Sequence, residues 1–293
     1  MSKKTVKLAE KIIRKAVSES VRSLLSEKYG IPNGVESLAD SILYHTRERW
    51  NNGDVTPFLL KCNLVPREHI VVYPTRKNVR AAYGAQPVDA DKPCYLFINP
   101  SIINDDVEEG NTLRATLIHE LTHLVEDMGR QKSGGLAGEI DRIGHEKAFN
   151  NVLGDRMLDD NKDKYSKIER DVNRAVFYGA SFERNARNAA MFAKLKDVPR
   201  GGIKTYQDAL NFIKGTKEYM YLDCYITSVE RLLALTKEDE KRLAMEALER
   251  ASNYRFKNWN QFCSWLRRNE ERYRNKMRTM IPKMIASVMQ DVN

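Results

Sequence analysis

The chain has 293 residues, of which 42% are hydrophobic and 30% are charged, and its formal net charge is +9. A chain of this length can bury a substantial core, as one large domain or two modest ones. No apolar run approaches the roughly 18 residues of a membrane-spanning helix, and the first residues do not resemble a signal peptide. We therefore expect a soluble, cytoplasmic protein without membrane contact, whose positive charge favours a polyanionic partner.

The periodicity of apolar residues changes along the chain. Helical spacing is expected over 3–29 and 37–50, whereas the short runs 69–74 (HIVVYP) and 93–100 (PCYLFINP) are typical of strands. A helix follows, with its N-cap at Asn111 or Thr112 and its end near Gly129. Further helices are predicted over about 145–157, 164–176, 182–196, 205–214, 218–234, 237–252 and 257–288, and Pro282 is expected to kink or end the last one.

This order of elements predicts an α+β fold. We expect N-terminal helices over 1–53, a core with a small mixed sheet packed on a helix over 54–160, and a mostly α-helical extension over 161–293. Four widely spaced cysteines form no CxxC pair, which argues against a zinc ribbon and against a disulfide framework.

The strongest functional motif is the HExxH pentapeptide at 119–123. His119 and His123 are four residues apart, so on a helix both imidazoles lie on one face and can bind the same ion. Glu120 lies about 100° round the helix, where its carboxylate can reach a metal-bound water as a general base. The motif predicts a zinc-dependent peptidase, and a pair of structural helix histidines is the alternative.

A catalytic zinc site normally has three protein ligands, so HExxH alone is incomplete. One candidate for the third is His145, which follows a glycine-rich loop, and the other is Glu183, early in a later helix. Glu139 and Asp141 are weaker candidates. The residue pattern alone leaves this choice open.

The stretch from His69 to Asp155 resembles the SprT-like metallopeptidase domain. The resemblance rests on the strand 96–99 (LFIN), the helix segment 116–123 (TLIHELTH), and Gly144-His145 with Phe149 four residues later. It implies a zincin-like fold in which His119, His123 and His145 bind Zn2+ and Glu120 is the general base. Members of this family include proteases that act on DNA-bound proteins, and similar domains are common in phage proteins.

The C-terminal segment is strongly basic. From Arg255 to Lys283 there are nine basic and two acidic residues, with aromatic residues interleaved. Exposed aromatic side chains would stack on bases beside phosphate-binding arginines, whereas buried ones would be core with the charges on a solvated face. The predicted nucleic-acid contacts are Arg267, Arg268, Arg272, Arg274 and Lys276.

Two hypotheses follow from the sequence. The first is a zinc metallopeptidase that hydrolyses a protein substrate and is brought to nucleic acid or a nucleoprotein assembly by its basic C-terminus. The second is a structural or interaction protein, for example a component of a virion, that keeps a zincin scaffold without turnover.

Overall fold

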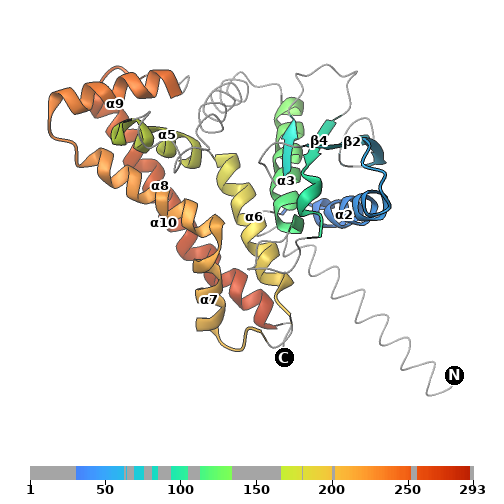
Figure 1. Ribbon diagram of the computed structural model, residues 1–293. Coiled ribbons are helices and arrows are strands. Elements are labelled where there is room, and N and C mark those ends of the chain that lie inside the picture. Colours follow the sequence, from blue (N-terminus) through green and yellow to red (C-terminus); the bar gives the residue numbers. More distant parts are fainter. Residues whose placement is uncertain are drawn as a thin grey trace.

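The computed structural model of this chain is a mixed α+β fold that is mostly helical (Figure 1). It describes residues 31–62, 64, 69–75, 81–84, 94–104, 113–133, 166–179, 181–199, 202–251 and 256–290. The helices expected over 3–29 and 145–157 lie outside these residues. Among the described helices, none combines the length and the apolar character needed to span a membrane.

The N-terminal part combines two helices with a four-stranded sheet. It contains α2 (Val35–Asn51), β1 (Phe58–Lys61), β2 (His69–Pro74), β3 (Ala81–Gly84), β4 (Cys94–Ile98), the 3-10 turn η1 (Pro100–Ile102) and α3 (Leu113–Ser133). The strand order is β1-β2-β4-β3, with β2 and β4 parallel and both edge strands antiparallel to their neighbours. The sheet is therefore mixed, as expected.

The predicted strands form the middle of this sheet. β2 has the predicted bounds, and β4 falls within the predicted 93–100. Their alternating residues Ile70, Val72, Leu96 and Ile98 are fully buried, each stabilising the fold by about 1.5–3 kcal/mol. The edge strands β1 and β3 were not predicted, because four residues such as Ala-Ala-Tyr-Gly carry little strand propensity and gain their conformation from pairing with a neighbour.

The C-terminal part is helical. It contains α5 (Lys167–Gly179), α6 (Ser181–Asp197), α7 (Tyr206–Gly215), α8 (Lys217–Leu233), α9 (Glu238–Ala251) and α10 (Trp259–Gln290). Of the two outcomes expected at Pro282, a kink or an end, the end is wrong, since α10 continues for eight residues beyond it. Pro282 is exposed, so the carbonyl group that loses its helical hydrogen bond at this position can be hydrated.

Helix α6 connects the two parts, lying between α3 and the remaining C-terminal helices in Figure 1. Four alanines at helical spacing on α6 (Ala186, Ala189, Ala190, Ala193) are completely buried, and such small side chains allow close helix approach. Arg114 at the start of α3 bonds Asp197 at the end of α6, 3.0 Å from Nη1 to Oδ1, so the two helices are antiparallel. The segment predicted as an extension beyond residue 160 thus packs directly on the HExxH helix.

Candidate metal centre

The two motif histidines lie in the middle of α3 and face each other. Their Nε2 atoms are 3.1 Å apart, and the rings are perpendicular with centroids separated by 4.6 Å. The side chains are 16% and 13% exposed, whereas Leu117, Leu121 and Leu124 on the same helix are completely buried. The histidines therefore sit at the edge of the core, where solvent reaches them.

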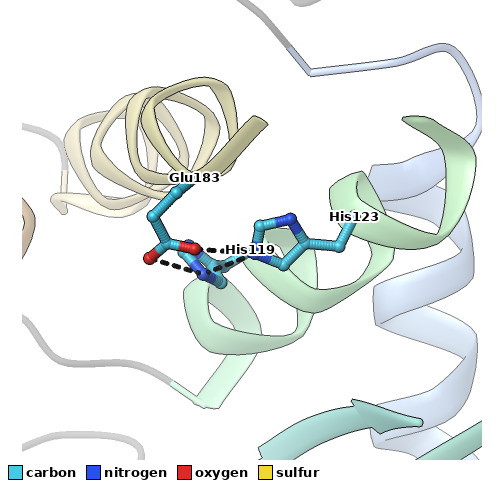
Figure 2. A group of neighbouring side chains, drawn as sticks. All are labelled: His119, His123 and Glu183. Carbon is cyan, nitrogen blue, oxygen red and sulfur yellow. Dashed lines mark hydrogen bonds and ion pairs between the residues drawn. The ribbon is translucent and has the colours of Figure 1, made fainter. Parts of the chain in front are cut away.

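Glu183 in the first turn of α6 completes a cluster with this pair (Figure 2). Its Oε1 is 3.7 Å from Nε2 of His119, and its Oε2 is 3.2 Å from Nε2 of His123. In a tetrahedral zinc site with bonds of about 2.0–2.2 Å, ligand atoms are about 3.3–3.4 Å apart. The separation of the two Nε2 atoms and the shortest oxygen–nitrogen distance from Glu183 to each imidazole bracket that value, with a different carboxylate oxygen nearest to each ring, so this group could hold one ion.

The electrostatics of His119 and Glu183 suit metal ligands, whereas Glu183 holds His123 toward its protonated form. Burial lowers the pKa of His119 to about 3, so its imidazole is neutral at physiological pH. Burial acts in the same direction on His123, but its hydrogen bond to Glu183 and the charge of that carboxylate outweigh burial and raise its pKa. Burial alone would raise the pKa of Glu183, yet the cations around it, Arg187 above all, hold that pKa well below its ordinary value. A neutral imidazole and an ionised carboxylate are the forms that bind a metal ion.

A buried arginine contacts the carboxylate of Glu183. Nη2 of Arg187, one helical turn further along α6, bonds Glu183 Oε1. The guanidinium carbon of Arg187 lies 4.8 Å from the ring centroid of Tyr178 and 4.4 Å from that of Tyr221, distances typical of cation–π contacts. The contact of Arg187 with Glu183 was not predicted from the sequence. The four-residue spacing of an acidic and a basic residue on one helix was the available signal.

A second polar contact fixes α6 beside α3. Nδ2 of Asn185 donates a hydrogen bond to Oε1 of Glu126, one turn beyond the HExxH motif, over 2.8 Å.

Glu120 is half-buried on α3, close enough to His123 for its charge to help raise the pKa of that histidine. Glu183 is thus the candidate third ligand that the structure brings to the pair, and His145 lies outside the described residues.

The predicted nucleic-acid contacts all lie on α10 but differ in their surroundings. Arg267, Arg268 and Arg272 are exposed, and no ion pair is recorded for them among the described residues. Arg274 bonds Glu270 and Glu230, with Nη2 2.6 Å from Oε1 of the latter. Nζ of Lys276 donates to Oδ1 of Asn185 over 2.7 Å. Arg274 and Lys276 therefore have side-chain partners within the protein, whereas the other three residues are exposed.

The aromatic residues of the basic segment belong mainly to the core. Phe262 is completely buried and Tyr273 is 1% exposed, and neither presents a ring to solvent. Trp259 and Trp265 are half-buried, and both pack against Phe262, with ring centroids 5.6 and 6.1 Å away. Base stacking on this segment, one of the two readings of its sequence, is disfavoured by this burial.

Comparison with known proteins identifies no relative: no family model, curated protein or solved structure matches the chain.

Proposed function

We propose that this protein is a zinc-dependent metallopeptidase with its ion held by His119, His123 and Glu183. The observation that carries the proposal is the convergence of these side chains from two helices at the separations of a tetrahedral site. Two histidines and one glutamate are a known ligand set of catalytic zinc, which leaves a fourth position for water. When bound, zinc would acidify this water and polarise the scissile carbonyl group.

Glu120 acts as the general base in this proposal. It follows His119 directly on α3 and is half-buried, next to the proposed metal site. Its carboxylate accepts the proton of the attacking water and later donates this proton to the leaving amine. The partial exposure of the two histidines, 16% and 13%, leaves room for substrate and water on the open side. Burial of Glu183 on the other side fixes the ligand carboxylate.

The sheet supports a peptide as the substrate class. β3 contacts α3 and pairs with β4, and its second edge has no partner among the described strands. Such an edge can hydrogen-bond an extended chain by strand addition, which would place a peptide backbone next to the HExxH helix. We also infer that this sheet and α3 form a zincin-like core.

The ligand set departs from the one implied by the SprT-like resemblance, in which His145 is the third ligand. Glu183 is favoured because it is 2% exposed, ionised and already within 3.7 Å of both imidazoles. A relation to that family remains a proposal that concerns the core alone.

Metal content and proteolysis together test this function. The purified protein is expected to hold one zinc ion and to cleave an unfolded protein substrate. Glu120→Gln should abolish cleavage and retain zinc, and Glu246→Gln, at an exposed position on α9, is the matched control. Zinc without cleavage under any condition would favour the structural or interaction protein. Loss of zinc in His145→Ala, with retention in Glu183→Ala, would overturn the ligand assignment.

The exposed face of α10 supports a polyanionic partner. This helix has 32 residues and is about 48 Å long, and Arg267, Arg268 and Arg272 lie along its exposed side. Binding to duplex DNA is expected to weaken steeply with salt. Neutralising all three should lower the slope of log K against log salt by about 2.7 if each contacts a phosphate. Arg242→Ala, at a 72% exposed site on α9, is the control, and equal slopes for both variants would contradict the proposal.

A further inference from the structure

The carboxylate of Glu183 presents both of its oxygens to the histidine pair. Figure 2 shows the carboxylate facing the two rings. Oε1 lies 3.7 Å from His119 Nε2, and Oε2 lies 3.2 Å from His123 Nε2. A carboxylate in this orientation can bind an ion through one oxygen or through both. This inference rests on the proposed metal site. In that site, binding through one oxygen or through both decides how many coordination positions of the ion remain for water.

Arg187 competes for one of these oxygens. Its Nη2 bonds Oε1, and no contact of Arg187 with Oε2 is recorded. The guanidinium group is well fixed, because its side chain is 10% exposed and it lies over the rings of Tyr178 and Tyr221, which stack with centroids 5.1 Å apart. A planar donor group held in this way bonds Oε1 at little cost in side-chain entropy.

We propose that Arg187 is a positioning residue that makes Glu183 a one-oxygen ligand. By binding Oε1 it leaves Oε2 alone for the ion, so that the two imidazoles and one oxygen occupy three positions and the fourth stays open for the water that Glu120 deprotonates. Tyr178 and Tyr221 act one step further out, by fixing the guanidinium group that holds the carboxylate.

This role predicts an unusual separation of effects. Removing Arg187 frees Oε1 for the ion and removes a positive charge from its neighbourhood, so zinc affinity should not fall. Hydrolysis should slow, because the second oxygen competes with water for its position. If Arg187 merely held the local structure together, affinity and turnover would fall in parallel.

The experiment compares Arg187→Met with Arg184→Met in the full chain. Arg184 is the matched control, since it lies on the same helix and packs over Tyr273, 5.7 Å from its ring centroid. We would measure zinc affinity by chelator competition, kcat on the unfolded substrate, and the visible spectrum of the Co2+-substituted protein, which reports coordination geometry. For Arg187→Met we expect wild-type or tighter zinc binding, a kcat about 10–100-fold lower, and weaker Co2+ absorption as the coordination number rises.

Two results would overturn the inference: a Co2+ spectrum of Arg187→Met that matches the wild type, or weaker zinc binding in that variant. If Arg187→Met does not fold, Arg187→Lys replaces it. Lysine lacks the planar fork, so the same spectral change is expected to a smaller extent, and an unchanged spectrum again refutes the role. Failure of the wild-type protein to bind zinc would instead refute the proposed function, so the two failures are distinguishable.

Discussion

Helix α6 is anchored to α8 by a buried ion pair. Nζ of Lys194 lies 2.7 Å from Oε2 of Glu218, and these side chains are 2% and 14% exposed. At this separation and an effective dielectric constant of about 20, the attraction is about 6 kcal/mol. Desolvation of both charges offsets much of this attraction. Glu218→Gln removes the attraction and leaves a buried cation, so the free energy of unfolding should fall by about 3–5 kcal/mol.

Urea unfolding followed by circular dichroism measures this loss. The double variant Lys194→Met/Glu218→Gln should recover part of the stability, because it leaves no buried cation. Together with Lys194→Met alone, these variants complete a double-mutant cycle that gives the coupling between the two side chains. A loss below about 1 kcal/mol in Glu218→Gln would refute the reasoning, since this is the range of an exposed ion pair.

Three further predictions concern stability. Tyr225 is completely buried and its hydroxyl has no hydrogen-bond partner among the described residues, so Tyr225→Phe should raise thermal stability by up to about 1 kcal/mol; a loss of that size would contradict this. Arg114→Met should cost about 1.5–3 kcal/mol in urea unfolding, because Arg114 bonds Asp40 and Asp197, and a change within experimental error would exclude a stabilising role. Hydrogen bonds from Thr205 lower the pKa of Asp208 in the capping box of α7. The stability that the Asp208 carboxylate contributes is fully present above its unfolded-state pKa of 3.8 and is lost as pH falls through its lower folded-state pKa. The difference in the free energy of unfolding between wild type and Asp208→Asn should therefore shrink as pH falls below 3.8, and a constant difference would refute this.

The local pattern of the sequence predicts most of the elements of this fold. Apolar residues at helical spacing located α2, α3 and α5 to α10 to within a few residues, because that spacing is the condition for burying one face of a helix. The alternation in HIVVYP likewise located β2. The edge strands β1 and β3 were missed, because they depend on pairing with residues distant in the sequence.

The candidate site divides in the same way. The placement of His119 and His123 on one face of a helix follows from the sequence, because the four-residue spacing and the helical period are both local. The meeting of Glu183, 60 residues beyond His123, with this pair could not be predicted, since that contact depends on how α6 packs against α3. Packing likewise brings Arg187 against Glu183 and over the rings of Tyr178 and Tyr221, because side chains from α5, α6 and α8 meet only once the core is packed.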